Sequence, residues 1–289
     1  MRILVIGKNG QLGKSIHKLV ANTKQNDNFI FAGRKELDLS NKNNIACYFQ
    51  GNVFDIIINC AAYTAVDKAE RERGLANQVN NLAVGQLAQI AKNQRAKLIH
   101  ISTDYVFDGK SSQPYKEADK TNPINIYGKT KLAGEVILQR IMSINAIIIR
   151  TSWLYSEYGN NFVKTMLKLG KEKNEINIVS DQIGSPTYAG DLAEAILKII
   201  NNKNYLEQQS TEIYHYSNEG EVSWFDFAKE IFKITKTDCK VKPITTDQYP
   251  TPAKRPENTT MSKTVIADSF GISIVPWRIS LISFLKSCD

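Results

Sequence analysis

The first 150 residues alternate short apolar runs with longer stretches in which apolar residues recur at helical spacing. The apolar runs are Ile3–Ile6, Phe29–Ala32, Asp55–Asn59, Leu98–Ser102 and Ala146–Arg150. The stretches between them are Gln11–Ala21, Asn43–Phe49, Ala69–Asn93 and Lys129–Ile141. Continuous apolar runs are typical of strands buried on both faces, and intervening helices supply the crossovers that a parallel sheet needs. The alternation therefore predicts an α/β fold of the Rossmann type, with a doubly wound parallel sheet.

The rest of the chain predicts a smaller C-terminal α/β portion that binds the substrate. We expect a strand at Asn177–Val179 and helices at about Gly190–Ile200 and Trp224–Thr235. The proline-rich stretch Tyr249–Pro256 must be a loop, because proline lacks an amide hydrogen and restricts the residue before it. It is either an ordinary surface loop or one that covers a ligand. We expect a dinucleotide-binding domain over 1–152 with a return at about 188–204, and the substrate-binding portion over 153–187 and 205–289.

Composition limits the partners of this chain. The 37 Lys+Arg exceed the 29 Asp+Glu by 8, yet the positive charges form no block and no basic strip alternates with aromatic residues. Nucleic acid is therefore not an expected partner, whereas an anionic small ligand stays open. The apolar runs fall far short of the roughly 20 residues that cross a bilayer, and the N-terminus has no signal-peptide layout. Cys47, Cys60, Cys239 and Cys288 form no CxxC pair. We expect reduced thiols in a cytoplasmic protein.

A glycine-rich turn follows the first predicted strand. The segment Gly7-Lys8-Asn9-Gly10-Gln11-Leu12-Gly13 has the spacing GxxGxxG and opens the first predicted helix. Glycines permit a tight turn and let a pyrophosphate approach the backbone amides at a helix N-terminus. A glycine triplet alone is a weak signal, but its place in the first strand–turn–helix unit strengthens it. The segment predicts a dinucleotide cofactor.

The end of the second strand bears on the choice between NADPH and NADH. An acidic residue there would accept hydrogen bonds from the ribose 2′-hydroxyl, whereas a basic residue tolerates a 2′-phosphate. This chain has Gly33-Arg34-Lys35, so Arg34 favours NADPH over NADH, although it could equally be a solvated loop arginine. Asp38 and Leu39 follow and could approach the adenine, while Asp38 could instead cap the next helix.

Two side chains with a use in proton transfer come one helical turn apart. Tyr127 and Lys131 are separated by four residues, so they share a helix face. A free tyrosine has a pKa of about 10, which a nearby ammonium group lowers, so that the pair can act as a general acid or base. Thr103, at the end of the fourth strand, could hydrogen-bond the reacting oxygen. The three residues predict a site for general acid–base chemistry next to the predicted dinucleotide.

Motifs along most of the chain match, in order, those of a known family. They are GKNGQLG (Gly7–Gly13), AAYTAVDKAE (Ala61–Glu70), STDYVFDG (Ser102–Gly109), YGKTKLAGE (Tyr127–Glu135), RTSWLY (Arg150–Tyr155), GNNFVKTM (Gly159–Met166), DQIGSPT (Asp181–Thr187) and YPTPAKRP (Tyr249–Pro256). The chain resembles the extended short-chain dehydrogenase/reductase family, and within it the dTDP-4-dehydrorhamnose reductases. The resemblance implies NAD(P)H-dependent reduction of the 4-keto group of dTDP-6-deoxy-L-lyxo-4-hexulose to dTDP-L-rhamnose, the last step of dTDP-L-rhamnose biosynthesis. It also implies that the predicted substrate-binding portion holds a sugar nucleotide.

The resemblance assigns roles to single residues. Tyr127 would donate the proton to the sugar C4 oxygen, Lys131 would bind the nicotinamide ribose, and Thr103 would hydrogen-bond near the carbonyl. The remaining cofactor contacts would come from Gly10, Gln11 and Leu12 at the pyrophosphate, Asp38 and Leu39 at the adenine, and Ala61, Ala62 and Tyr63 at the nicotinamide side. The sugar nucleotide would meet Thr103, Asp104, Trp153, Asn161 and Arg255. Trp153 offers a flat apolar face, although ordinary core packing would also explain it, and the Arg255 guanidinium suits phosphate oxygens.

The chain departs from the family pattern at one place. Some members join two subunits through a magnesium site built from glutamates, and the matching positions here are Ser15, Gly190 and Arg278. Because magnesium needs oxygen ligands, usually carboxylates, we expect no metal and either a monomer or a homodimer formed without magnesium. Two alternatives stay open. One is a reductase of opposite facial selectivity, which would give dTDP-6-deoxy-L-talose, and the other is a non-catalytic regulatory subunit of this fold.

Overall fold

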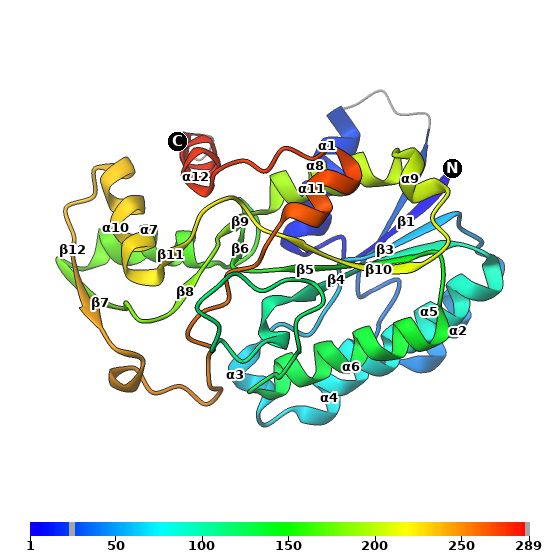
Figure 1. Ribbon diagram of the computed structural model, residues 1–289, viewed down its shortest axis with the longest axis horizontal. Coiled ribbons are helices and arrows are strands. Elements are labelled where there is room, and N and C mark those ends of the chain that lie inside the picture. The colour runs from blue at the N-terminus through cyan, green and yellow to red at the C-terminus, as the bar shows by residue number, and fades with distance from the viewer. Residues whose placement is uncertain (23–26, 287–289) are drawn as a thin grey trace.

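A parallel sheet of six strands forms the centre of the molecule in the computed structural model, which describes residues 1–22 and 27–286 (Figure 1). The strands are β1 (Arg2–Ile6), β2 (Asn28–Ala32), β3 (Ile56–Asn59), β4 (Lys97–Thr103), β5 (Ala146–Thr151) and β10 (Thr211–Tyr216). Their order is β10-β5-β4-β3-β1-β2, and each neighbouring pair is parallel. The order reverses between β1 and β3, the place where open α/β sheets bind ligands.

Helices cover both faces of this sheet, as the alternating apolar residues require. One face is covered by α1 (Gln11–Asn22), α8 (Ala189–Ile200) and α11 (Thr264–Phe270), and the other by α2 (Lys42–Phe49), α5 (Ala83–Gln94) and α6 (Ile126–Ile141) (Figure 1). On β1, Ile3 and Val5 are buried toward the first set, while Leu4 and Ile6 are buried toward the second. The doubly wound α/β fold predicted from the sequence is confirmed.

The helix expected over Ala69–Asn93 is interrupted. The chain forms α3 (Val66–Ala69), α4 (Arg73–Asn77), a π-helical turn (Gln78–Leu82) and then α5. The widened turn directs Asn80 toward the loop after β3, where its side chain accepts a hydrogen bond from Tyr63 N and donates one to Tyr63 O. Gly134 on α6 lies so close that an added Cβ would overlap Asn80 O. Contacts with this loop and with α6 thus override the helical pattern.

A smaller α/β portion lies at one end of the sheet (Figure 1). Its strands β7 (Glu175–Val179) and β12 (Lys240–Ile244) pair in parallel. The short strands β6 (Leu154–Tyr155), β8 (Ile183–Gly184), β9 (Thr187–Tyr188) and β11 (Val222–Ser223) pair as β6 with β9 and β8 with β11. Helices α7 (Phe162–Glu172), α10 (Trp224–Thr235) and α12 (Trp277–Lys286) enclose an apolar core with these strands, and α9 (Lys203–Leu206) leads back to β10.

The boundary expected at residue 205 is wrong for two segments. Strand β10 pairs with β5 as the edge strand of the main sheet, and α11 packs on it. Both had been expected in the substrate-binding portion. The sequence signal is weak because β10 alternates polar residues with apolar ones, unlike the buried inner strands. In the part of the chain that the structure describes, no helix is both long and apolar enough to span a bilayer.

Candidate active site

A cavity of about 760 Å³ opens at the carboxyl ends of the sheet strands, where the strand order reverses. It is bounded by the glycine-rich turn after β1, the loops after β2 and β3, the end of β4, the start of α6 and the Trp153 segment after β5. The predicted residues that line it are Gly7, Gly10, Gln11, Leu12, Arg34, Asp38, Leu39, Ala61, Ala62, Tyr63, Thr103, Asp104, Tyr127, Lys131 and Trp153. Residues far apart in the sequence thus meet in one cavity.

The glycine-rich turn has the geometry of a dinucleotide cradle. Gly7 has φ +92°, and a Cβ there would come within 2.9 Å of Ala61 N. Gly10 N donates to Gly7 O at 2.9 Å, and Gln11 begins α1, so unpaired helix amides face the cavity. Gly13 does not line the cavity in the described part of the chain. It lies against the turn instead, so close that a Cβ there would overlap Gly7 O. It lets α1 pack against the turn, as the third glycine of such motifs does.

The loop after β2 carries the residues expected at the adenine end. The Arg34 side chain is 75% exposed, and its Nε lies 3.4 Å from Asp38 Oδ2. Asp38 accepts from Ser40 N and Oγ, whereas Asn41 accepts from Asn43 N and Asn44 N and caps α2. The alternative of Asp38 as the helix cap is therefore wrong. Arg34 is left as an exposed cation at the cavity rim.

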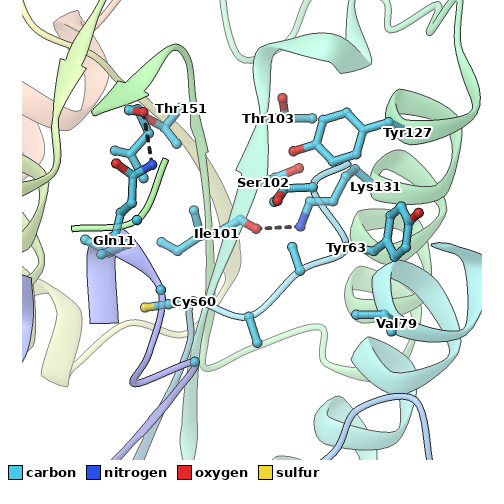
Figure 2. A pocket seen from close by; sticks show the side chains of 18 of the residues that line it. Gln11, Cys60, Tyr63, Val79, Ile101, Ser102, Thr103, Tyr127, Lys131 and Thr151 are labelled. Atoms are coloured by element: carbon cyan, nitrogen blue, oxygen red, sulfur yellow. Dashed lines mark hydrogen bonds between the residues drawn. The ribbon is translucent and has the colours of Figure 1, made fainter. Parts of the chain in front are cut away.

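Tyr127 and Lys131 lie one turn apart at the start of α6. Asn125 caps the helix by accepting from Gly128 N, and the helix approaches the 3-10 turn after β4 (Asp104–Val106) so closely that a Cβ on Gly128 would overlap Tyr105 O. Lys131 is only 1% exposed, and its Nζ donates to Ile101 O at 2.6 Å. Figure 2 shows the hydroxyl of Tyr127 on the same side of the cavity as Thr103 and the Lys131 amine.

Burial dominates the protonation of this pair. It raises the pKa of Tyr127 to about 12, with hydrogen bonding between Tyr127 and Thr103 opposing the shift and Asp104 adding to it. It lowers the pKa of Lys131 to about 8, with Glu135 opposing. Burial thus raises the pKa of Tyr127, against the lowering expected from Lys131, whose Nζ donates to Ile101 O and contacts His100 on β4. At neutral pH Tyr127 is a phenol, which is the form that can donate a proton.

The end of β4 supplies a hydroxyl and a buried carboxyl group. Thr103 Oγ1 donates to Asp104 Oδ1 at 2.9 Å. Asp104 is 3% exposed, and burial raises its pKa to about 6. Its other oxygen, Oδ2, makes no hydrogen bond of good geometry within residues 1–22 and 27–286, although the Thr259 side chain lies near enough to hold down the pKa of the carboxyl group. A buried oxygen without such a bond at a cavity wall is well suited to accept a hydrogen bond from a ligand hydroxyl.

Trp153 is paired with a second tryptophan that the sequence analysis did not connect with the site. Its ring stacks on Trp224 with centroids 3.4 Å apart and planes inclined by 8°. Both line the cavity, so one face of the Trp153 indole is covered by Trp224. Gly184 makes room for the indole, since a Cβ there would come within 2.6 Å of it. The aromatic pair Trp224-Phe225 was the only sequence signal for Trp224.

Asn161 and Arg255 do not belong to the described lining of the cavity. Asn161 caps α7 by accepting from Lys164 N, and its Nδ2 donates to Gln11 Oε1 and Ser156 O. Its neighbour Asn160 lines the cavity instead. The Arg255 guanidinium forms an ion pair with Asp67. The structure therefore engages both proposed diphosphate ligands elsewhere, and an N-cap asparagine before an apolar helix was the missed signal for Asn161.

The positions that match the magnesium site do not suit a cation. Ser15 Oγ donates to Gln11 O, and Arg278 forms an ion pair with Glu230. Gly190 offers no side-chain donor. Across the described ranges, no group of three His, Cys, Asp or Glu side chains could hold a metal ion.

Comparisons with known proteins agree with this architecture. The family model described as RmlD substrate binding domain matches residues 1–289. A dTDP-4-dehydrorhamnose reductase of Aggregatibacter actinomycetemcomitans is 42% identical over 97% of each chain. The structure of a Clostridium acetobutylicum dTDP-4-dehydrorhamnose reductase superposes with TM-score 0.93 at 40% identity, covering 100% of this chain and 99% of that one. The Bacillus anthracis reductase, solved in complex with NADP, gives 0.91 at 39% identity and 99% of each chain. The chain therefore belongs to the RmlD family, that of the dTDP-4-dehydrorhamnose reductases.

Proposed function

We propose that the protein catalyses the NADPH-dependent reduction of the 4-keto group of dTDP-6-deoxy-L-lyxo-4-hexulose to dTDP-L-rhamnose. This is the last step of dTDP-L-rhamnose biosynthesis, and we place it in the cytoplasm. The observation that carries the proposal is the convergence of Tyr127, Lys131 and Thr103 on the cavity whose opposite wall is the glycine-rich turn. Membership of the family and the NADP complex of the Bacillus anthracis relative support the reaction and the cofactor.

The chain's own residues would hold the dinucleotide along this wall. The amides of Gln11 and Leu12 at the N-terminus of α1 suit the pyrophosphate, and Gly10, whose own amide donates to Gly7 O, would lie beside it without a side chain in the way. Exposed Arg34 suits a 2′-phosphate, which favours NADPH over NADH. Ala61 and Ala62 leave space next to the backbone for the nicotinamide side. When bound, the reduced nicotinamide supplies the hydride.

Tyr127 would donate the proton that completes the reduction. Its hydroxyl proton goes to the C4 oxygen of the sugar, which becomes the new hydroxyl group, and the phenolate left behind is reprotonated before the next turnover. Because burial keeps the pKa of Tyr127 at about 12, the phenol is fully protonated at neutral pH. Thr103 would hydrogen-bond near the same oxygen, and Lys131 would bind the nicotinamide ribose with the N–H that β4 leaves free.

The test follows oxidation of NADPH and of NADH with enzymatically prepared substrate, for the unchanged protein and for Tyr127→Phe, with and without a chelator. NMR identifies the sugar product. We expect dTDP-L-rhamnose, a loss of ~10²- to 10⁴-fold in kcat for Tyr127→Phe, and no effect of the chelator. Exposed Tyr249→Phe serves as the matched loss of a hydroxyl group and should leave kcat unchanged.

Other outcomes would replace the proposal. A dTDP-6-deoxy-L-talose product would keep the chemistry and reverse the face of hydride delivery. No turnover with either cofactor, from protein shown to be folded, would favour a regulatory subunit. We also propose a monomer or a homodimer formed without magnesium, which light scattering with and without chelator tests.

A further inference from the structure

A buried polar chain runs from Lys131 into the sheet, away from the cavity. Lys131 Nζ lies 3.2 Å from His100 Nε2, and His100 Nδ1 lies 3.1 Å from Asn59 Nδ2. Asn59 and His100 are 0% exposed and Lys131 is 1% exposed. Their positions follow from the register of the sheet, in which Asn59 on β3 pairs with His100 on β4. Because water does not reach these groups, their hydrogen-bond donors and acceptors must match one another.

The orientation of the Asn59 amide is set by the backbone. Its Oδ1 accepts a hydrogen bond from Ala61 N at 3.1 Å, so its NH₂ group faces His100. The amide nitrogen can only donate, and His100 Nδ1 must therefore accept. A neutral imidazole carries one N–H, which this arrangement assigns to Nε2. Asn59 thus selects the Nε2–H tautomer of His100.

This tautomer turns an N–H group toward Lys131. An ammonium group has three donors and no acceptor, so it would meet the imidazole donor with a donor of its own. A neutral amine has a lone pair that accepts from Nε2–H, one N–H for Ile101 O and one N–H left for the cavity. We propose that His100 and Asn59 are positioning residues that favour the neutral amine of Lys131 over its ammonium form, because only the neutral amine matches the tautomer that Asn59 selects.

The other charged and titratable groups around Lys131 do not supply this effect. Glu135 on α6 would favour the ammonium group, but it is tied to Arg150 of β5 by a buried ion pair at 2.7 Å. The titratable groups that line the cavity with Lys131 are Tyr127 of α6, Cys60 and Tyr63 after β3, Asp104 and Tyr105 after β4, and Arg34 and Asp38 at the adenine end. Burial holds the pKa of Cys60 and of Tyr127 near 12, so both are neutral at pH 8. The pKa of Lys131 is lowered to about 8, first by burial, in the direction of the proposal.

The consequence for the proposed reaction, on which this part rests, is a lysine that gains and loses its proton close to neutral pH. To take up the third proton, the lysine requires His100 to carry its hydrogen on Nδ1 instead. The Asn59 amide must then turn and give up its bond to Ala61 N. Forming the ammonium group, which would hold the ribose and stabilise a Tyr127 phenolate, therefore costs free energy, because residues of β3 and β4 must change their hydrogen bonds.

The first test uses ¹⁵N-histidine NMR of the unchanged free protein, with no substrate, so it stands whether or not the protein is a reductase. At pH 9.5 we expect the Nε2–H tautomer for His100, changing to Nδ1–H as Lys131 is protonated on acidification. The internal control is buried His215, whose Nδ1 lies 3.2 Å from Tyr115 O and whose Nε2 faces Arg150, so it should stay Nδ1–H. Nδ1–H on both buried histidines at pH 9.5 would overturn the proposal.

The second test changes the partner of the imidazole. In Asn59→Asp the carboxylate accepts from Nδ1–H, which leaves Nε2 as an acceptor for the ammonium group. We expect His100 in the Nδ1–H form throughout, and the basic limb of kcat/KM against pH to move up by ~1 unit or more. Asn59→Ala removes the donor without adding a charge. A smaller upward shift of the basic limb in this variant would show the effect of the tautomer apart from the attraction between the new carboxylate and the ammonium group. An unchanged tautomer and an unchanged limb in folded Asn59→Asp would refute the role of Asn59.

Discussion

Arg255 and Asp67 join the proline-rich segment to helix α3 through an ion pair in which Nη2 lies 2.8 Å from Oδ2. Asp67 also accepts from Ala253 N, and Asn125, the cap of α6, donates to Lys254 O. The segment is thus fastened to both helices that flank the Tyr127 side of the cavity. Arg255 is thus engaged within the protein, so it has two possible roles: the predicted diphosphate ligand, or a residue that holds the segment in place.

A double-mutant cycle on this pair separates the two roles. If Arg255 acts by fastening the segment, Arg255→Gln and Asp67→Asn should each raise the KM for the sugar nucleotide by a few-fold, and the double variant should be no worse than either. The half-exposed pair is worth ~0.5–1 kcal/mol, which sets that scale. Exposed Lys254→Gln is the control and should leave the KM unchanged. If Arg255→Gln raised the KM more than Asp67→Asn did, and the two effects were additive, Arg255 would be a diphosphate ligand.

Cofactor choice should depend on Arg34. Replacing it by alanine removes the cation expected to face a 2′-phosphate, so kcat/KM for NADPH should fall about 10-fold while that for NADH stays the same. Steady-state kinetics with both cofactors measure the ratio. Lys35→Ala, an equal loss of charge at the next exposed position, should change the ratio much less. Equal losses for both cofactors would contradict discrimination by Arg34.

Asp104 should lower stability above pH 6. Its pKa is raised to about 6 in the folded protein, so between pH 4 and 6 the folded state holds more protons than the unfolded one, and stability falls as pH rises. Asp104→Asn avoids this loss and should raise the free energy of unfolding by about 1–2 kcal/mol at pH 8. The gain should shrink below pH 6, as urea denaturation would measure.

The same change should cost activity, because it removes an acceptor at the cavity wall. Exposed Asp268→Asn is the matched control, and its effect should stay within about 0.5 kcal/mol at either pH. A variant no more stable than the unchanged protein at pH 8 would show that the buried carboxylate carries no penalty.

The stack of Trp153 on Trp224 should matter for the sugar nucleotide and not for the dinucleotide. Stacked aromatic pairs are worth ~0.5–1.5 kcal/mol, so Trp224→Ala should raise the KM for the sugar nucleotide about 3- to 10-fold and leave the KM for NADPH unchanged. Phe225→Ala, at the adjacent position outside the described cavity lining, is the control. If both variants changed the KM for the sugar nucleotide equally, Trp224 would contribute only ordinary packing.

The sequence was most informative where local chemistry and burial agree. The inner strands β1, β3, β4 and β5 were predicted because they are mostly buried and rich in apolar residues. Edge strand β2 is only half-buried, but its apolar run Phe29–Ala32 was still enough to predict it. The glycine turn and the Tyr127–Lys131 spacing were found for a similar reason, since a turn and a helix repeat fix their geometry locally. Edge strand β10 has polar residues among its apolar ones and was missed, because only the partner β5 makes it a strand.

The differences from expectation at the site have another cause. Asn161 and Arg255 have the right chemistry for phosphate, but the helix end at α7 and the carboxylate of Asp67 take up their donors and acceptors. The protonation of Tyr127 depends on how deeply α6 is buried against β4, which no spacing in the sequence states. Trp224 reaches the cavity only because α10 packs against α7. Such competition for partners is a property of the tertiary structure.

The late return of the chain to the sheet also has a consequence for how the protein is made. Ile266 and Phe270 on α11, with Ile272 just beyond, complete the apolar layer that Ile3 and Val5 of β1 begin. During synthesis, the apolar layer over β1 therefore stays incomplete until residues near the end of the chain have been made. A truncated product that carried the whole dinucleotide cradle would leave this layer open to water, and exposed apolar surface of that kind favours aggregation. Folding of the nucleotide-binding half is thus a property of the nearly complete polypeptide.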